Sequence, residues 1–465
     1  MIRCDIVVIG GGPAGLAAAI QSKKDGAEVL LIEREAALGG ILKQCIHDGF
    51  GVIRFGEKLT GPEYADRFIR EFEALKVPTL LSSFVTKIDR EKDGGFTLHA
   101  VNTDGVLLIN ARALVFATGC RERTPRQIKI HGTRPAGILT AGAAQHYVNL
   151  SGQRIGNKCV ILGSGDIGLI MARRLTLEGM EVLGVYEIMP VPSGLPRNIR
   201  QCLEDFNIPL HLSKTVTRVF GAGRVEKVEV MSVDEKLNPV PGTEEIIPCD
   251  TLIISAGLIP ENELTETLGI SIDPKTKGPA LDMNFETDVP GVFACGNCFH
   301  VYDLADNVSI SGERAGSAAA LYVKGLLSKT GPQEVTIPEK KAVPPGSLVC
   351  IGCPKGCVLS VSEENGEYIV TGNACPRGAA FAKKEMTSPT RTLCTTVKTR
   401  SEDCPVLPVR TEGEIPKALL LPAMAEINRF ILDRPVSPGT VLIEDLLGTG
   451  IPVIAASSYD PADHR

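Results

Sequence analysis

The chain of 465 residues has no tryptophan, only 5% aromatic residues, and no apolar run near the ~20 residues that span a membrane. Basic residues are not in excess: 49 Lys and Arg against 55 Asp and Glu leave a formal net charge of −6, which argues against a nucleic-acid surface. No signal peptide precedes the first apolar stretch, so we expect a cytoplasmic protein. Cysteine, in contrast, is frequent. Fourteen cysteines in such a chain favour thiols, metal ligands or redox chemistry over structural disulfides.

A glycine-rich turn lies between two apolar segments near the start. The pattern predicts a strand, a helix and a second strand, at residues 4–9, 14–24 and 28–32. The turn contains three glycines, Gly10, Gly12 and Gly15. The first allows the turn, the second lets backbone N–H groups approach a pyrophosphate, and the third lets helix and strand pack closely. Glu33 follows the second strand, where a carboxylate binds an adenosine ribose. We therefore predict a dinucleotide-binding unit.

The same arrangement recurs in the middle of the chain. A strand, a helix and a second strand are predicted at residues 159–162, 167–177 and 181–186, with a turn made by Gly163, Gly165 and Gly168. Glu187 takes the place of the acidic residue. Two complete copies are far more specific than one, so two dinucleotides are expected. Glu187 would repel a 2′-phosphate and residues 187–194 contain no Arg or Lys, which favours NAD(H) over NADP(H).

The composition changes after residues 331–346, which are rich in Pro, Lys and Glu and predict a linker. Four cysteines follow, in the spacing CxxCxxxC and then eighteen residues on: Cys350, Cys353, Cys357 and Cys375. Each lies in a segment with Gly or Pro. Three close thiolates and a remote fourth favour a 4Fe-4S cluster. Zinc is the alternative, although Cys₄ zinc sites more often pair two CxxC motifs.

Other elements are predicted from periodicity and composition. We expect a helix at 61–75, a strand at 79–88, a hairpin of 96–100 and 106–109, an apolar strand at 113–119 that ends in Ala-Thr-Gly, a helix opening at Thr140, a helix at 311–327, a helical stretch at 415–432 and a strand at 439–444.

These motifs together resemble a known family, the two-dinucleotide FAD/NAD oxidoreductases encoded beside bacterial and archaeal glycerol-3-phosphate dehydrogenases. The resemblance rests on the paired glycine turns and on residues 39–51, 133–145 and 291–309. The region 350–456 resembles a small Cys-rich domain of unassigned function, with its signature at residues 350–357, 372–378 and 389–398. The chain thus looks like a fusion of two subunits. Related flavoprotein subunits also serve opine, proline or cyanide-forming dehydrogenases.

The resemblance implies an α/β fold of the glutathione- and thioredoxin-reductase type. Two Rossmann-like domains are expected, with the NAD domain inserted in the FAD domain, followed by a small α+β Cys-rich domain. The implied boundaries are 1–119 and 281–330 for the FAD domain, 120–280 for the NAD domain, 331–347 for the linker, 348–458 for the Cys-rich, iron-sulfur-like domain and 459–465 for a tail.

The resemblance also implies further cofactor-binding positions. These are Gly40 beside the first glycine turn, Val85 facing the adenine with its backbone, the segment ends at Thr118, Gly119 and Gly257, and Asn297 at the ribityl chain. Asn297 stands where the family has an Asp, so it brings hydrogen bonds but no charge.

Two residues after the Gly39-Gly40 pair have no assigned role. In the disulfide-reductase branch a Cys here has a partner five residues later, but Phe50 stands five residues after Cys45, so that disulfide cannot form. Cys45 is then either a flavin-facing thiol or a small buried residue. His47 is either a proton donor to reduced flavin or a histidine bonded within a glycine-rich loop. No catalytic side chain is assigned.

The sequence therefore predicts an FAD-dependent NAD(H) oxidoreductase that passes electrons between NAD(H), flavin and an iron-sulfur cluster. The implied partner is a flavin-dependent glycerol-3-phosphate dehydrogenase subunit in a hetero-oligomer, without nucleic acid or a membrane span. The alternatives are a separate NADH oxidase or disulfide reductase, or a subunit of an opine- or proline-type dehydrogenase, with a structural zinc tail.

Overall fold

The computed structural model describes residues 2–92, 94–335, 343–344, 346–364 and 366–462. Parts of the predicted linker and of the predicted tail lie outside these ranges. Contacts within the chain define two compact units. Unit 1 comprises Met1–Cys45, Phe50–Arg121 and Leu258–Ile337, and unit 2 comprises Ile46–Gly49, Glu122–Gly257 and Pro338–Arg465. Within the described ranges, no helix has the length and apolar character that crossing a membrane requires.

Unit 1 is built on a mixed sheet in which the strands follow the order β5-β2-β1-β8-β7-β6, with β20 paired to β8. The bounds are β1 Ile2–Ile9, β2 Val29–Ile32, β5 Thr79–Leu80, β6 Phe84–Arg90, β7 Phe96–Asn102, β8 Gly105–Phe116 and β20 Val292–Ala294. Strands β5, β2, β1, β8 and β20 run parallel, whereas β6 and β7 are antiparallel. The central strands are buried and apolar, as expected where a parallel sheet is covered on both faces.

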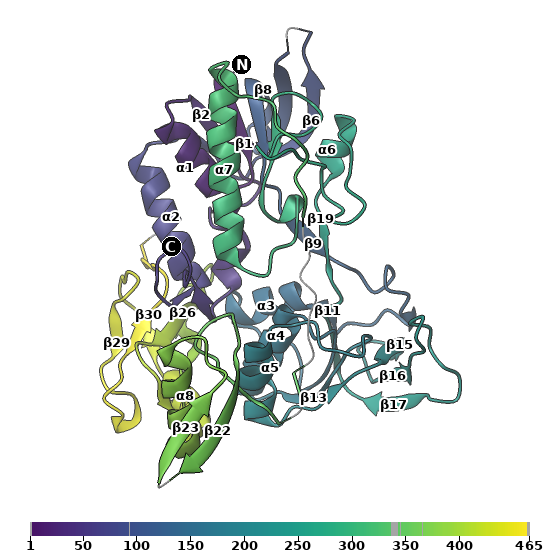
Figure 1. The fold of residues 1–465 in the computed structure, drawn as a ribbon, viewed down its shortest axis with the longest axis vertical. Helices are drawn as coiled ribbons and strands as arrows, with labels where there is room; N and C mark the ends of the chain where they lie inside the picture. The colour runs from purple at the N-terminus through teal and green to yellow at the C-terminus, as the bar shows by residue number, and fades with distance from the viewer. Residues whose placement is uncertain (1, 93, 336–342, 345, 365, 463–465) are drawn as a thin grey trace. The chain divides into compact units, whose positions relative to one another are not determined.

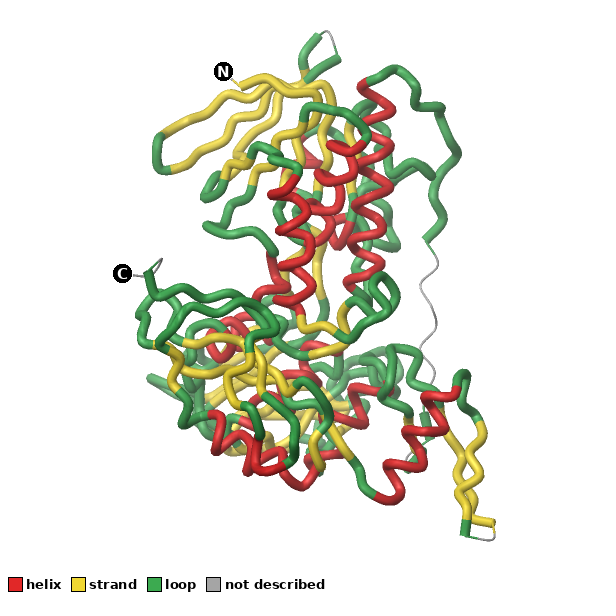
Figure 2. Tube along the Cα trace, turned by 90° about the vertical axis from the view of Figure 1, so that its left-hand side faces the viewer, coloured by secondary structure: helices red, strands yellow, loops and turns green. Residues whose placement is uncertain are grey.

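The helices of unit 1 lie along this sheet, as the red tubes beside the yellow strands in Figure 2 show. They are α1 Pro13–Lys24, α2 Gly61–Ala74, α6 Glu263–Thr267 and α7 Ala305–Val323. Helices α1 and α7 approach so closely that side chains at Gly312 and Gly316 would overlap backbone atoms of Ala14 and Ala18. The small residues Gly312 and Gly316 of α7 and Ala14 and Ala18 of α1 allow this close packing. The packing holds α7, which follows β20, beside the helix that begins at the first glycine turn.

Unit 2 contains a five-stranded parallel sheet in the order β11-β18-β12-β13-β14. Its strands and helices are β11 Ile138–Thr140, β12 Lys158–Leu162, β13 Glu181–Tyr186, β14 Leu210–His211, β18 Thr251–Ile254, α3 Ala141–Asn149, α4 Asp166–Leu177 and α5 Pro196–Cys202. A four-stranded sheet packs with it, made of β10 His131–Gly132, β15 Lys214–Phe220, β16 Lys227–Ser232 and β17 Glu245–Pro248. The second predicted dinucleotide unit is thus β12-α4-β13.

The C-terminal part of unit 2 has two layers of its own, drawn in green and yellow in Figure 1. A small antiparallel sheet consists of β21 Leu348–Val349, β22 Val358–Glu364 and β23 Glu367–Thr371, followed by α8 Pro376–Thr387. A five-stranded sheet in the order β28-β25-β26-β30-β29 follows, with α9 Leu420–Ile427 against it. Its strands are β25 Cys394–Thr399, β26 Val406–Thr411, β28 Ile431–Leu432, β29 Val441–Ile443 and β30 Val453–Ala455. Leu177 of α4 belongs to the same apolar cluster, so this part packs on the inserted domain.

Short elements complete the fold. They are β3 Asp48–Phe50 with β4 Leu59–Thr60, β9 Cys120–Glu122 with β19 Leu258–Pro260, β24 Thr390–Arg391 with β27 Ile415–Pro416, and the 3₁₀ turns η1 Gly40–Gln44, η2 Glu204–Phe206, η3 Gly296–Cys298, η4 Lys417–Leu419 and η5 Leu446–Gly448.

Several predicted elements differ from those observed. The predicted hairpin strand at 106–109 and the predicted apolar strand that begins at 113 are parts of one long strand, β8, because its first half pairs with β7 and its second half with β20. The predicted strand at 79–88 is split into β5 and β6. Helix α7 begins at Ala305, six residues before the predicted start, because Asp306 and Ser309 are buried within it despite their weak helix preference. The stretch 415–432 is helical only in η4 and α9, since Ile431–Leu432 pairs with β25.

Residues 258–280, assigned from the sequence to the NAD domain, are part of unit 1 by their contacts. Ile270 belongs to the apolar core of that unit, and Leu264 and Leu268 pack against it. A side chain at Gly278 would overlap the carbonyl oxygen of Phe299. The contacts therefore place the end of the inserted segment at Gly257, because the apolar residues that follow it are buried in unit 1.

Candidate functional site

The first glycine turn joins β1 to α1 in a geometry that only glycine permits at two positions. Gly10 has a φ of +111°, and a side chain there would overlap the carbonyl oxygen of Ala117. A side chain at Gly15 would overlap the carbonyl oxygen of Gly10. The two residues thus account for the tight turn and for the close contact of helix and strand.

Gly12 is different, because a Cβ built on it meets no atom within 4 Å. It is the N-cap residue of α1, which receives no side-chain hydrogen bond and has no acidic residue in its first turn. The N-terminal N–H groups of this helix thus adjoin open space, as an anion site requires. Gly40, with a φ of +53°, lies close to Gly12. A Cβ placed on Gly40 would be 3.0 Å from the Gly12 Cα. These residues fit the pyrophosphate of FAD.

Glu33 is buried directly beside this turn. Its Oε2 accepts a hydrogen bond from the Gly11 N–H at 2.6 Å, and its Oε1 accepts one from the Glu35 N–H at 2.8 Å. The side chain is 6% exposed. Backbone donors thus hold the carboxylate at the end of β2, in the position predicted for a ribose contact.

The other predicted flavin positions also belong to unit 1. The Thr118 hydroxyl donates to the Glu261 carbonyl oxygen at 3.0 Å, and the Gly119 carbonyl oxygen accepts from the Glu261 N–H at 3.0 Å. Asn297, in η3, accepts from the Tyr302 N–H at 3.2 Å. The side chain of Val85 is buried in β6. Their roles toward FAD stay predictions.

The second glycine turn repeats the first in unit 2. Gly163 has a φ of +100°, and a side chain there would overlap the Ser255 carbonyl oxygen. A Cβ on Gly168 would lie 2.6 Å from the Gly163 carbonyl oxygen, whereas the nearest atom to a Cβ on Gly165 is 3.6 Å away. Gly257, with a φ of +100°, accepts the Arg123 N–H at 3.2 Å. The open middle glycine again stands at the N-terminus of a helix, α4.

Glu187 is held in the same way as Glu33. Its Oε2 accepts from the Ser164 N–H at 2.9 Å and from the Ser164 hydroxyl at 2.5 Å, and its Oε1 accepts from the Met189 N–H at 3.0 Å. The Ser193 hydroxyl adds a contact at 3.2 Å. The side chain is 4% exposed. A carboxylate fixed here by backbone donors suits a ribose diol and opposes a 2′-phosphate.

Cys45 and His47 lie in desolvated surroundings. Burial raises the pKa of the Cys45 thiol to about 12, so it is protonated at neutral pH. Burial also lowers the pKa of His47 to about 4, and the nearby charges of Arg197 and Arg173 act in the same direction. His47 Nδ1 is 3.2 Å from its neighbour's carbonyl oxygen, that of Asp48. At pH 7 His47 is thus mainly uncharged, and both predicted roles, a proton donor to reduced flavin and a histidine bonded within the loop, stay predictions.

Arg197, at the start of α5, reaches the same segment. Its Nη2 donates to the Asp48 carbonyl oxygen at 3.4 Å, and a side chain at Gly49 would overlap its guanidinium. The residue is 5% exposed, and its Nε has no hydrogen-bond partner among the described residues. The segment Ile46–Gly49 is thus attached to unit 2 through α5.

The four cysteines gather at one end of the sheet β21-β22-β23. Cys350 follows β21, Cys357 precedes β22, and Cys375 comes four residues after β23. Because the strands are antiparallel, these positions meet at the same edge, and the Cys350 N–H donates to the Cys357 carbonyl oxygen at 2.9 Å. Topology, more than spacing in sequence, brings Cys375 to the other three.

Two of the four thiols, those of Cys350 and Cys375, have pKa values displaced in opposite directions. Burial raises the pKa of Cys350, and the charges of the other three act in the same direction. Hydrogen bonds from the Gly378 and Arg377 N–H groups, at the start of α8, lower the pKa of Cys375. The Gly352 N–H lies 3.5 Å from the Cys350 Sγ. Four cysteine thiols with N–H···S contacts have the donor chemistry of an iron-sulfur cluster. Within the described ranges, however, no group of three or more His, Cys, Asp or Glu residues has the geometry of a metal site.

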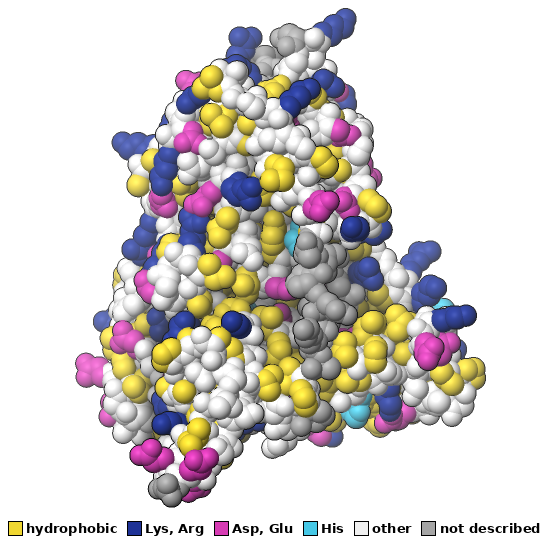
Figure 3. All heavy atoms as spheres, viewed as in Figure 1, with side chains coloured by type: hydrophobic (Ala, Val, Ile, Leu, Met, Phe, Trp, Pro, Cys, Tyr) yellow, Lys and Arg dark blue, Asp and Glu magenta, His cyan; other side chains and the backbone are white. Residues whose placement is uncertain are grey.

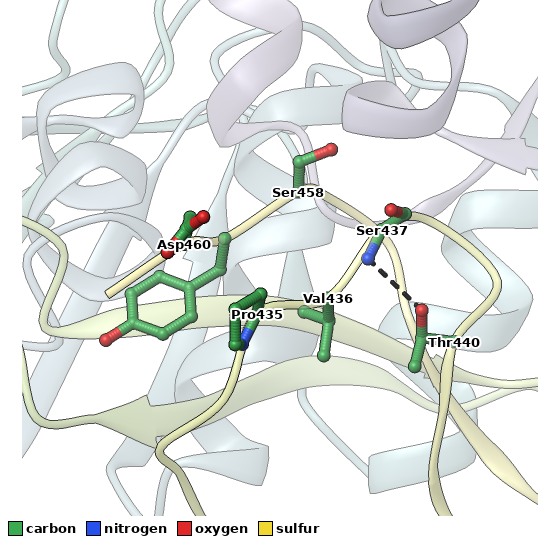
Figure 4. A pocket seen from close by; sticks show the side chains of 7 residues that line it. Pro435, Val436, Ser437, Thr440, Ser458 and Asp460 are labelled. Atoms are coloured by element: carbon green, nitrogen blue, oxygen red, sulfur yellow. Dashed lines mark hydrogen bonds between the residues drawn. The ribbon is translucent and has the colours of Figure 1, made fainter. Parts of the chain in front are cut away.

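A shallow depression of about 400 Å³ lies elsewhere in the C-terminal part (Figure 4). It is lined by Pro435, Val436, Ser437, Thr440, Ser458, Tyr459 and Asp460. The Ser437 N–H donates to the Thr440 hydroxyl at 3.1 Å. The turn closed by this hydrogen bond forms one side of the depression. Its lining includes none of the cofactor-binding or metal-ligating residues predicted from the sequence.

Two polar residues that contact predicted positions carry no assignment from the sequence, Ser164 beside Glu187 and Arg197 beside the Ile46–Gly49 segment. Ser164 occupies the position of Gly11 in the first turn, so the internal repeat itself was a signal for its contact with Glu187. Arg197 carried no such signal. Its contact with the Ile46–Gly49 segment joins positions about 150 residues apart and depends on the tertiary fold alone.

Comparison with known proteins agrees with the fold described above. The family described as "Pyridine nucleotide-disulphide oxidoreductase" matches residues 4–312, and the family described as "Protein of unknown function (DUF1667)" matches residues 376–457. The latter match begins one residue after Cys375.

Individual relatives are distant. An opine oxidase subunit of Agrobacterium tumefaciens (strain Ach5) is 23% identical over 344 residues, covering 70% of this chain and 67% of that protein. A ferredoxin--NADP reductase of Leuconostoc citreum (strain KM20) is 26% identical over 334 residues, covering 69% and 91%. The crystal structure of Lactococcus lactis thioredoxin reductase superposes with a TM-score of 0.58 at 21% identity, over 70% of this chain and 100% of that chain.

The family match includes both glycine turns, both buried glutamates and the return segment at Asn297, which is about two thirds of the sequence. The structural likeness confirms the predicted fold, a thioredoxin-reductase-like pair of Rossmann domains with a small C-terminal domain. The chain therefore belongs to the pyridine nucleotide-disulphide oxidoreductase family and is an FAD-dependent oxidoreductase of pyridine nucleotides.

Proposed function

We propose that this protein passes electrons between NAD(H), FAD and a 4Fe-4S cluster on Cys350, Cys353, Cys357 and Cys375, as the flavoprotein subunit of a glycerol-3-phosphate dehydrogenase complex. The observation that carries the proposal is the placement of these four cysteines at one edge of the sheet β21-β22-β23, which adjoins the NAD domain. When bound, FAD exchanges two electrons with NADH, and a four-iron cluster exchanges them singly.

The residues of the chain position the cofactors. The open N-termini of α1 and α4 bind the two pyrophosphates, and Glu33 and Glu187 bind the riboses. Glu187 is buried, acidic and already bonded through both oxygens, which supports NAD(H) over NADP(H).

The partner assignment has separate support. The opine oxidase relative, which matches 70% of this chain, is named as one subunit of its enzyme, so the same fold serves in multi-subunit enzymes. The resemblance in residues 39–51, 133–145 and 291–309 favours glycerol 3-phosphate as the partner's substrate.

The test begins with protein purified without oxygen. Iron, acid-labile sulfide, zinc and flavin are measured together, and the absorbance is followed as NADH is added. We expect about four irons and one FAD per chain, and bleaching by NADH. FAD with zinc and no iron would exclude the electron-relay function. For the partner, glycerol 3-phosphate added to the complex isolated from its native source should reduce NAD⁺, and failure would reject that assignment.

A pair of variants locates the cluster. Cys350→Ser should lose most of the iron and keep FAD. Cys404→Ser is the matched control, because Cys404 lies in the same C-terminal part and donates to the Val406 carbonyl oxygen, outside the four-cysteine site. Equal iron in both variants would show that the cluster lies elsewhere.

A disulfide reductase is the second candidate, since the family's name describes that activity. The observations at Cys45 oppose it. Phe50 occupies the place of the partner cysteine, and burial raises the pKa of the Cys45 thiol to about 12. A thiol with so high a pKa provides little thiolate for attack on a disulfide.

A further inference from the structure

The two cysteine-bearing segments share a short motif that the proposed cluster does not explain. Cys353-Pro354-Lys355-Gly356 and Cys375-Pro376-Arg377-Gly378 have the same pattern, a cysteine followed by proline, a basic residue and glycine. Lys355 and Arg377 are both exposed, and both glycines are buried. The same basic position is thus presented twice, on the two segments that the sheet brings together.

Charge is segregated along this part of the chain. Residues 346–362 contain one charged residue, Lys355, and residues 368–384 contain three, all basic. The chain as a whole carries a net charge of −6. The acidic residues gather at the opposite end of the hairpin, where Glu364 pairs with Glu367. They lie in the magenta group at the lower tip in Figure 3. The seven residues of β22, at about 3.3 Å each, place this end roughly 20 Å from Cys357.

One side of the cysteine loop is closed by the inserted domain. Gly356, with a φ of +57°, packs so that a built Cβ would lie 3.4 Å from the Pro196 Cβ at the start of α5. Helix α8, which begins next to Cys375, is held by Glu385, whose carboxylate pairs with Arg391 and Arg200. Lys355 and Arg377 remain exposed despite these contacts. An electron partner therefore has access to the thiols from the side that bears the two basic residues.

We propose that Lys355 and Arg377 form the docking surface for a small acidic one-electron carrier protein, which binds transiently over the cysteine site. The inference rests on the proposed redox role of the four cysteines. The surface is basic and polar, with Val358 as its exposed apolar neighbour at 41%. Small, charge-guided contacts are typical of transient electron-transfer encounters, whereas permanent interfaces between subunits are larger and more apolar. The overall reaction balances as NADH plus two oxidised carriers giving NAD⁺, one proton and two carriers reduced by one electron each.

The test uses the full-length, cofactor-loaded protein and an acidic bacterial ferredoxin as the probe. The variant Lys355→Glu is compared with Lys398→Glu, which makes the same charge change at an exposed position on β25, outside the two cysteine-bearing segments. Arg377 is left unchanged in this test, because its backbone N–H donates to the Cys375 thiol. At low salt, the first variant should bind ferredoxin at least tenfold more weakly and reduce it at least tenfold more slowly with NADH. The control variant should change either quantity less than threefold.

The salt dependence of ferredoxin binding and reduction distinguishes an effect on docking from an effect on electron transfer within the protein. The difference between the first variant and the wild type should shrink as salt rises to 0.5 M, because charges on an exposed surface are then screened. Iron content and NADH-dependent reduction of an uncharged quinone should be unchanged in both variants. Normal iron and quinone reduction with unchanged ferredoxin binding would overturn the docking surface alone. Wild-type protein with zinc in place of iron would overturn the proposed function, and the docking inference with it.

Discussion

Arg391 of the C-terminal part and Asp205 of the inserted domain form a buried, two-pronged ion pair. The Arg391 Nε lies 2.5 Å from the Asp205 Oδ2, and its Nη2 lies 2.9 Å from the Oδ1. Their side chains are 2% and 1% exposed. Glu385 binds the same guanidinium through two further hydrogen bonds of 2.7 Å. Such pairs fix geometry, and the loss of one member leaves a buried charge without its partner.

Replacing Asp205 by Asn should therefore destabilise unit 2 by about 3 kcal/mol, measured as the free energy of unfolding in urea. Lys417→Ala is the control. Lys417 also contacts Asp205, at 3.1 Å, but is 32% exposed, so we expect less than about 1 kcal/mol. A similar loss of unfolding free energy in the two variants would show that the buried ion pair contributes no more to stability than the exposed contact of Lys417.

The same variant has a defined dependence on pH. Burial by itself raises the pKa of Asp205, but the hydrogen bonds and charges of Arg391 and Lys417 outweigh burial and lower it. A depressed pKa gives stability that is present above the unfolded value, about 4, and is lost as the pH falls through the folded value. The difference between wild type and Asp205→Asn should thus be constant from pH 7 to 5 and shrink below about 4.

The two glycines of the first turn should respond differently to alanine. Gly12 has a φ of −77° and open space around its Cβ, so Gly12→Ala should fold normally and lose FAD, because the methyl group occupies the approach to the pyrophosphate. Gly15→Ala should be destabilised instead, since its methyl group would overlap the Gly10 carbonyl oxygen. Flavin content and thermal unfolding distinguish the two. A Gly12→Ala protein with full flavin would refute the position assigned to the cofactor.

Glu187→Ala should weaken NADH binding and leave FAD in place. The loss of a charge-assisted hydrogen bond to a ribose hydroxyl corresponds to about 1.5–3 kcal/mol, or roughly tenfold to a hundredfold in affinity. Titration of flavin bleaching with NADH measures the change, and flavin content is the internal control. The preference for NADH over NADPH should also fall. Unchanged NADH affinity would remove Glu187 from the binding site.

His47→Asn tests the desolvation of the segment Ile46–Gly49. The folded pKa of His47 is about 4, below the unfolded value of about 6.5, so the unfolded state binds a proton between these values and wild type loses stability there. Relative to wild type, His47→Asn should gain up to about 2 kcal/mol of unfolding free energy between pH 8 and pH 5. Urea unfolding at both values measures this gain. An equal difference at both would show that His47 is solvated.

The two dinucleotide-binding units can be predicted from local sequence patterns. Gly10, Gly15, Gly163 and Gly168 are required by local backbone geometry, and the buried strands around them are continuous apolar runs, so short-range physical chemistry was sufficient. The acidic residues Glu33 and Glu187 follow from the same local repeat. In both units the glutamate accepts a hydrogen bond from the backbone N–H of the residue that follows the first glycine, Gly11 or Ser164. Each of these contacts lies within a single strand-helix-strand unit.

The other features depend on contacts between segments that are distant in the sequence. Strand β8 is one strand because two different partners pair with its halves, and residues 258–280 are part of unit 1 because their apolar side chains are buried there. The convergence of Cys375 with Cys350 depends on the antiparallel hairpin between them. The pairing of Arg391 with Asp205 joins residues 186 positions apart, and no pattern in the sequence marks either one. Such contacts follow from packing of distant segments, which periodicity and spacing do not encode.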